Sequence, residues 1–308
     1  MRYDSDTIQN NKNLEENNMK KILAFLMAGA MTAAAFSGCG GSSSGSGSQA
    51  SESKTESSQT SAASGSSDND WSYIADKGSM TIGITYFEPM NYMQDGKLTG
   101  FETDFATAVC EELGIQPNFQ EIDWESKELE LNAKTIDCIW NGMTITDERK
   151  ANMDISVPYM ENKQVIVVKA ENVSKFSTAE GMKGASVVAE AGSAGEEVAQ
   201  GEEFFKEAKY LSVDSQAKAL LEVKSGTADV AVIDYVMSIG TLRAGSDYAD
   251  LKVVEAQSFA PEQYGIAFRK NSSQTLTKVN AAIEKLAKDG KLAEIADKYN
   301  LKEQIIVK

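Results

Sequence analysis

Short apolar stretches alternate with amphipathic stretches between residues 80 and 234, and this alternation restricts the fold to a few architectures. Met80–Thr85 has the composition of a strand, and an amphipathic helix follows it with Phe105, Val109 and Leu113 on one face. Repeated strand–helix units predict an α/β fold, in which a mainly parallel sheet carries helices on both faces. Ligands bind such sheets at the carboxyl ends of the strands.

The stretch Asp137–Arg149 combines a short buried strand with a group of hydrogen-bond donors. The Asn-Gly pair after the strand exposes backbone N–H groups, Thr144 adds a hydroxyl, and Arg149 adds a planar guanidinium. A guanidinium can hold a carboxylate through two parallel hydrogen bonds, so this stretch suits a small carboxylate ligand. The alternative interpretation is a plain strand-to-helix loop, with Thr146 as N-cap and Arg149 in a surface ion pair.

A second group of strands and helices begins near Lys169 and repeats the first. Lys134–Ile139 and Gly226–Ala231 share the same order of a helix end, a Thr, an Asp and an apolar strand. The first lobe presents the cation Arg149 at its strand ends, and the second presents the anion Asp234. A zwitterion would bridge the two.

Two strands are predicted to join the lobes. The chain crosses at about Val165–Lys169 and returns at about Ala260–Gly265, which makes a hinge. We therefore assign residues 71–166 plus 265–308 to lobe 1 and residues 167–264 to lobe 2.

The first seventy residues have the composition of a targeting signal followed by a flexible linker. Residues 1–18 are polar and are interpreted as an untranslated extension, and residues 19–38 as a signal peptide whose apolar part is too short to span a bilayer. Cys39 follows Phe-Ser-Gly, which resembles the bacterial lipobox, so we expect it to be acylated; a plain secretory signal is the alternative. Residues 39–70 are rich in Ser and Gly and form a disordered linker.

The composition excludes several classes of function. The chain has no histidine, which excludes Ser-His-Asp and Cys-His catalysis and His-ligated zinc. A formal net charge of −16 argues against nucleic acid or an anionic membrane surface as a partner. The three cysteines show no CxxC spacing, and Cys110 and Cys138 occupy apolar positions typical of free buried thiols, although an extracellular disulfide is the alternative. No cofactor and no metal are expected.

From about residue 71 to residue 303 the chain resembles the type II periplasmic-type substrate-binding proteins of polar amino-acid ABC transporters, family 3. The matching segments are Asp95–Asp104, Met143–Arg149, Val157–Tyr159, Gly226–Asp229 and Asp289–Lys291. The resemblance implies a two-lobed fold with a two-strand hinge, and a monomer that is lipid-anchored to the outer face of the cell membrane. It implies that the protein binds a free polar amino acid and delivers it to an ABC permease.

The resemblance also implies which residues bind the ligand. They are Phe87, Trp124, Asn141, Gly142, Thr144, Arg149, Glu190, Ser193, Ala194 and Asp234. Arg149 would hold the α-carboxylate, Asp234 would hold the α-ammonium, and two aromatic side chains would sandwich the ligand's side chain. Glu190 stands where the family commonly has an apolar residue, and Asn-Gly replaces a frequent Ser-Ser.

Plainer roles remain open for several of these residues. Phe87 and Trp124 could be ordinary core, Asp234 could cap a helix, and Glu190 and Glu88 could be solvated charges rather than groups that read a cationic or amide side chain. The ligand's side chain is expected to be polar, as in glutamine, cystine or a basic amino acid. Two other functions stay open: a sensor lobe for a signalling partner, and a dehydratase-type enzyme in which Glu190 acts as acid or base. We expect a binding protein and not an enzyme.

Overall fold

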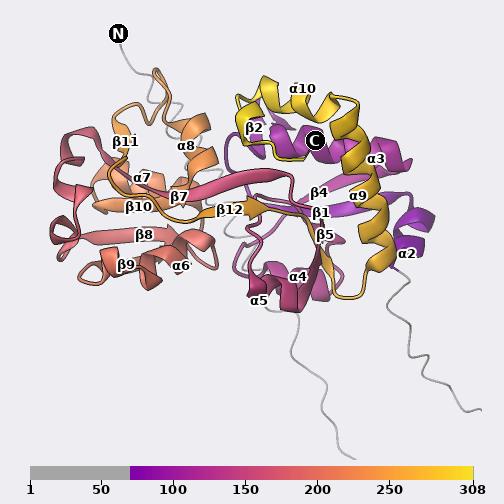
Figure 1. The fold of residues 1–308 in the computed structure, drawn as a ribbon, viewed down its shortest axis with the longest axis horizontal. Coiled ribbons are helices and arrows are strands. Elements are labelled where there is room, and N and C mark those ends of the chain that lie inside the picture. Colours follow the sequence, from indigo (N-terminus) through magenta and orange to yellow (C-terminus); the bar gives the residue numbers. More distant parts are fainter. Residues whose placement is uncertain (1–69, 308) are drawn as a thin grey trace, which may run out of the picture. The chain divides into compact units, whose positions relative to one another are not determined.

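The computed structural model describes residues 70–307, which form two lobes with one main sheet each (Figure 1). The expectations for the extension, the signal peptide, Cys39 and most of the linker fall on residues 1–69, outside the described residues. Within residues 70–307, no helix combines the length and the apolar character needed to cross a bilayer.

The sheet of the first lobe has the strand order β4-β1-β5-β13-β6. Its strands are β1 (Ser79–Ile84), β4 (Gln116–Glu121), β5 (Cys138–Ile139), β6 (Met153–Ile155) and β13 (Ala267–Arg269), with a separate hairpin of β2 (Tyr92–Gln94) and β3 (Lys97–Thr99). Its helices are α2 (Asp70–Lys77), α3 (Phe101–Leu113), α4 (Lys127–Asn132), α5 (Asp147–Asn152), α9 (Ser273–Lys288) and α10 (Lys291–Lys298), with a 3-10 turn at Lys302–Gln304.

The sheet of the second lobe has the order β11-β7-β10-β8-β9. Its strands are β7 (Met160–Lys169), β8 (Ser186–Glu190), β9 (Lys209–Val213), β10 (Val230–Asp234) and β11 (Leu251–Val253), and β12 (Pro261–Tyr264) pairs with β7. Its helices are α6 (Ala194–Gly201), α7 (Gln216–Ser225) and α8 (Tyr235–Thr241), with 3-10 turns at Ala170–Asn172, Lys175–Ser177, Glu180–Met182 and Glu203–Phe205.

Each main sheet contains one strand that runs against the others. β13 is antiparallel to both of its neighbours in the first sheet, and β7 is antiparallel to β10, β11 and β12 in the second. The neighbouring pairs β1–β4, β1–β5, β8–β10 and β8–β9 are parallel. The predicted α/β fold with two lobes and mainly parallel sheets is therefore confirmed.

The two crossing strands lie side by side as an antiparallel pair, visible as β7 and β12 in Figure 1. Residues 160–163 pair with residues 261–264. From Gln164 onward, β7 pairs with β10 and then with β11, so residues 164–166 already belong to the second sheet. The first crossing thus lies a few residues before the predicted Val165–Lys169, because one continuous strand serves both the hinge and the second sheet.

The repeated Thr-x-Asp order has the same structural role in both lobes. The carboxylate of Asp137 accepts a hydrogen bond from the backbone N–H of Thr81 over 2.7 Å, and Asp229 accepts one from the N–H of Ser186 over 2.9 Å. In each lobe an Asp just before a parallel strand therefore fixes the beginning of the neighbouring strand.

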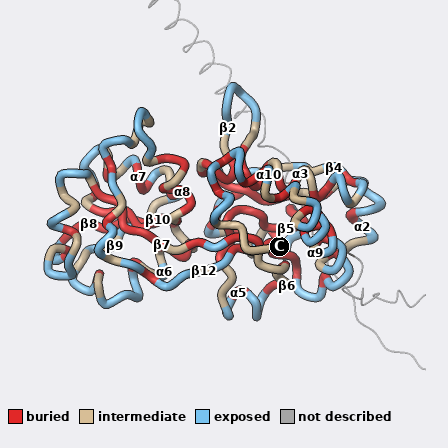
Figure 2. Tube along the Cα trace, turned by 45° about the horizontal axis from the view of Figure 1, so that its top comes forward, coloured by how far each residue is buried: buried red, intermediate tan, exposed pale blue. Residues whose placement is uncertain are grey.

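One strand is displaced from its predicted position. The apolar and aromatic residues of Phe119–Trp124 predict a strand over these positions, but β4 pairs with β1 in the register Ser79↔Gln116 and ends at Glu121. Trp124 therefore lies in the loop after the strand, beside the start of α4. Figure 2 shows that buried segments concentrate in the sheets of both lobes. Cys110 on α3 and Cys138 on β5 are free and buried, as predicted.

Candidate functional site

A narrow chamber lies where strand ends of the two lobes meet. It contains about 260 Å³ of space between atoms, part of it open to solvent. Its walls are formed by Trp124, Asn141, Gly142, Thr144, Arg149, Glu190, Ser193, Ala194, Gln216 and Asp234. Nine of these ten are residues expected from the sequence, so the predicted set converges on one place. Gln216 was missed, because a glutamine at a helix start resembles an ordinary surface residue.

Arg149 enters the chamber from the first turn of α5. Thr146 caps this helix by accepting a hydrogen bond from the N–H of Arg149 over 3.1 Å. The buried guanidinium donates from Nη1 to the carbonyl oxygen of Thr144 over 2.8 Å, and from Nη2 to that of Gly192 in the other lobe over 3.3 Å. The helix-cap interpretation is therefore correct for Thr146. Arg149 is buried and lines the chamber, and its guanidinium also forms an ion pair at 3.6 Å with the exposed carboxylate of Glu197 in the second lobe.

Asp234 is the last residue of β10 and is held by three amide side chains. Its Oδ1 accepts from Asn162 Nδ2 and Gln164 Nε2, over 2.7 Å each, and its Oδ2 accepts from Gln216 Nε2. Burial raises the pKa of Asp234, and these hydrogen bonds lower it. Asp234 does occupy the N-cap position of α8, as the alternative interpretation has it, but its side chain makes no capping hydrogen bond to that helix.

Glu190 ends β8, and its side chain is 4% exposed. Its Oε1 is buried and has no hydrogen-bond partner among the described residues. Burial, with the nearby Asp234 carboxylate, raises the pKa of Glu190 to about 8, whereas Lys127 acts in the opposite direction. The interpretation of Glu190 as a solvated charge is therefore wrong.

Lys127 is a buried cation at the junction that sequence reasoning missed. Its Nζ donates to the carbonyl oxygens of Trp124 over 3.1 Å and Gly192 over 2.9 Å, and it lies 4.8 Å from the centre of the Trp124 ring. Burial and the neighbouring Arg149 lower the pKa of Lys127 to about 8. Gly192 has φ +66°, a left-handed conformation that favours glycine, and a Cβ there would lie 3.2 Å from Lys127 Nζ.

The N–H group of Gly142 is not free for a ligand, which corrects the expectation. It donates to Glu102 Oε1 over 2.8 Å inside the first lobe. The side chain of Asn141 also faces inward, because its Oδ1 accepts from the N–H of Thr85 over 2.9 Å. Burial raises the pKa of Glu102 to about 7. These two chamber residues therefore shape the wall by fixing the loop.

Phe87 does not line the chamber but lies directly behind it. A Cβ at Gly142 would come within 2.8 Å of the Phe87 ring, so the ring packs against the glycine. Trp124 does line the chamber. Glu88 forms an ion pair with Arg243 of the second lobe at 2.7 Å and is not among the residues lining the chamber.

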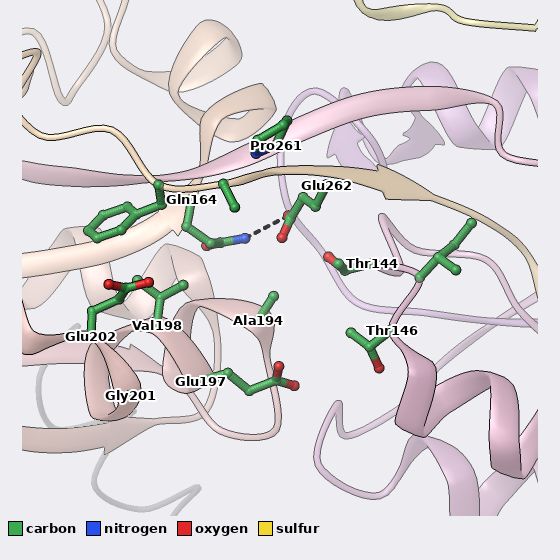
Figure 3. A pocket seen from close by; sticks show the side chains of 13 residues that line it. Thr144, Thr146, Gln164, Ala194, Glu197, Val198, Gly201, Glu202, Pro261 and Glu262 are labelled. Atoms are coloured by element: carbon green, nitrogen blue, oxygen red, sulfur yellow. Dashed lines mark hydrogen bonds between the residues drawn. The ribbon is translucent and has the colours of Figure 1, made fainter.

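The remaining wall comes from the start of α6 and opens into a groove. Ser193 caps α6 by accepting from the N–H of Glu196 over 3.1 Å, and Ala194 follows it. Figure 3 shows the adjoining groove, in which Thr144 and Thr146 face the side of α6 that carries Ala194 and Glu197. Gln164 donates to Glu262 there over 2.8 Å.

Comparisons with known proteins agree on one kind of relative. The model of a family described as "Bacterial extracellular solute-binding proteins, family 3" matches residues 80–302. The L-cystine-binding protein TcyJ of Escherichia coli is 28% identical over 228 residues, which cover 73% of this chain and 84% of that protein. The L-arginine-binding protein of Pseudomonas aeruginosa is 33% identical over 235 residues, covering 74% and 90%. The crystal structure of an ABC uptake transporter substrate binding protein from Streptococcus pneumoniae with bound histidine is 37% identical, with a TM-score of 0.69 and coverage of 75% and 96%.

Proposed function

Because the chain belongs to the bacterial extracellular solute-binding proteins of family 3, we propose that it binds a free polar amino acid between its lobes and delivers it to an ABC-type permease. The observation that carries this proposal is that Arg149 and Asp234, which come from different lobes, line the same chamber. The cystine, arginine and histidine in the names of its relatives support an amino-acid ligand.

The hydrogen-bonding capacity of Asp234 supports its role toward the α-ammonium. A carboxylate offers about four acceptor positions, and three of them are taken by Asn162, Gln164 and Gln216. Oδ2 accepts only the bond from Gln216, and the side chain lines the same chamber as Arg149. The guanidinium would exchange its bond to Gly192 for the ligand's α-carboxylate. Charge-assisted hydrogen bonds of this kind contribute about 1.5–3 kcal/mol each.

Closure of the lobes would make these contacts strong. Trp124 and the buried start of α6 shield the chamber from water, and electrostatic interactions strengthen where water is excluded. The paired strands β7 and β12 are the hinge about which the lobes would open for entry and release. The family acts outside the cytoplasm, as its description states. We also propose that the protein is a monomer and that acylated Cys39 anchors it to the cell membrane.

Isothermal titration calorimetry of the purified protein against the twenty amino acids and cystine tests this function. We expect saturable binding of at least one of them. Arg149→Ala should weaken that binding by roughly 2–5 kcal/mol, because a buried carboxylate would lose its charged partner. Arg149→Lys keeps the positive charge but lacks the planar guanidinium, so its affinity should lie between that of the wild type and that of Arg149→Ala. Absence of binding to every amino acid would refute the proposal.

A dehydratase-type activity on the same fold is the second candidate, favoured by one observation. Glu190 is a buried carboxyl group in the chamber with a raised pKa, which is typical of a general acid or base. We propose that the protein binds without chemical conversion. Mass spectrometry after incubation with amino acids and with prephenate-like acids separates the two functions, since a new product would indicate an enzyme.

A further inference from the structure

The chamber contains one buried acceptor that the protein itself leaves unpaired. Glu190 Oε1 has no hydrogen-bond partner among residues 70–307, although the side chain is almost completely buried and lines the chamber. Buried polar atoms in proteins are nearly always hydrogen-bonded, so such an atom in a ligand chamber points to a missing donor.

The nearby donors of the protein are already engaged. Gln216 and Gln164 direct their amide N–H groups to Asp234. Lys127 directs two N–H groups to the carbonyl oxygens of Trp124 and Gly192, and its ammonium also faces the Trp124 ring. Gln216 and Lys127 also act on the Glu190 carboxyl group, yet its Oε1 atom is left without a hydrogen-bond partner among residues 70–307.

The charges of the chamber indicate what kind of donor is missing. The α-carboxylate of a ligand would neutralise the charge of Arg149, and its α-ammonium would neutralise the charge of Asp234. Asp234 Oδ1 already accepts two hydrogen bonds, so it has no room for a second cation on that atom. Among the charged residues that line the chamber, Glu190 then remains without an opposing cation, because Lys127 acts on it from outside the lining. A ligand side chain ending in a carboxylate would bring another anion beside Glu190 and Asp234, and an apolar one would leave Oε1 unpaired.

We propose that Glu190 selects an amino acid whose side chain ends in a cationic N–H donor, a guanidinium or an ammonium. This inference rests on the proposed function and narrows its ligand to the basic amino acids. Glu190 would act as the specificity-determining residue, while Arg149 and Asp234 would bind the part that all amino acids share.

Arginine and citrulline test the proposal because they have nearly the same shape. Citrulline carries a neutral ureido group where arginine carries the guanidinium. Lysine and norleucine form a second such pair. Calorimetry should show that the wild-type protein prefers arginine to citrulline by roughly 10- to 100-fold, as expected for one hydrogen bond between charged groups. Glu190→Gln keeps the size of the side chain and should remove most of that preference without weakening citrulline.

Glu203→Gln is the matched control, since it removes one negative charge from an exposed position of the same lobe. It should leave the arginine-to-citrulline ratio unchanged. Equal binding of the two members of each pair by the wild type, or an unchanged ratio in Glu190→Gln, would overturn the role of Glu190 while leaving the proposed function intact. Failure of all amino acids to bind would instead refute the proposed function. The wild-type ratio decides the matter even if a variant does not fold.

Discussion

Arg149 in the first lobe donates a hydrogen bond from Nη2 to the carbonyl oxygen of Gly192 in the second lobe over 3.3 Å. Lys127 Nζ, also from the first lobe, reaches the same oxygen over 2.9 Å. Two buried cations therefore meet one backbone acceptor across the junction. Since Arg149 would leave this oxygen to bind a ligand, Lys127 would keep the lobes together during the exchange.

Lys127→Met should favour the open arrangement of the lobes. The substitution keeps a long side chain but removes the bond to Gly192, so the closed state loses a contact that the open state lacks. We expect a larger radius of gyration by small-angle X-ray scattering without ligand, and weaker amino-acid binding. Lys183→Met removes an exposed lysine of the second lobe and should change neither. Identical scattering and affinity in Lys127→Met and wild type would contradict a closing role.

Asp234→Asn should cost both stability and binding. The new amide NH₂ group would face one or more of the three amide donors that now point at the carboxylate, which leaves buried donors unpaired. We expect a loss of about 1–3 kcal/mol in the free energy of unfolding, measured by urea denaturation, and loss of ligand binding. Asp214→Asn, at an exposed position of the same lobe, should leave both values unchanged. A fully stable Asp234→Asn protein would disprove the three-amide arrangement.

Glu102 should make the protein less stable as the pH rises. Burial raises the pKa of Glu102 from 4.5 to about 7, so the folded state holds this proton more tightly than the unfolded state does. Its contribution to stability is thus fullest near pH 4.5 and declines as the pH rises through 7. Relative to wild type, Glu102→Gln should gain up to about 3 kcal/mol between pH 4.5 and 8. If the free energies of unfolding of the two proteins differed by the same amount at every pH in this range, the result would contradict this prediction.

The preference for arginine over citrulline should increase with pH if Glu190 binds the cation. Burial and the carboxylates of Asp234 and Asp123 raise the pKa of Glu190 to about 8, while Lys127 and the amide of Gln216 act in the opposite direction. Below that value Glu190 carries a proton that the guanidinium must displace, so the ratio should rise by up to about tenfold per pH unit and level off above pH 8. Calorimetric titrations of both ligands from pH 6 to 8.5 measure the ratio of their affinities. Deprotonation of the α-amino group affects both ligands equally and does not change this ratio. A flat ratio in wild type, equal to that of Glu190→Gln, would contradict the assignment.

Several features follow from the sequence alone because they depend on neighbours along the chain. Asp95-Gly96 has the sequence of a hairpin turn, and Gly114 that of a helix end. The structure has left-handed backbone at all three residues, because this conformation is a local property. The alternation of apolar and amphipathic stretches predicts the two α/β lobes. It also places Arg149 and Asp234 after strands, and hence at the edges where the lobes meet.

Only the tertiary structure decides what these charges contact. Lys127 is buried because Gly192, 65 residues away, brings its carbonyl oxygen to it. The N–H of Gly142 is unavailable because Glu102, 40 residues earlier, accepts its bond. Glu190 Oε1 has no partner among the described residues, while the amides of Gln164 and Gln216 donate to Asp234. The local sequence pattern determines where a polar group lies on its strand or helix. Its hydrogen-bond partner depends on which distant segments pack beside it, and the periodicity of the sequence does not contain that information.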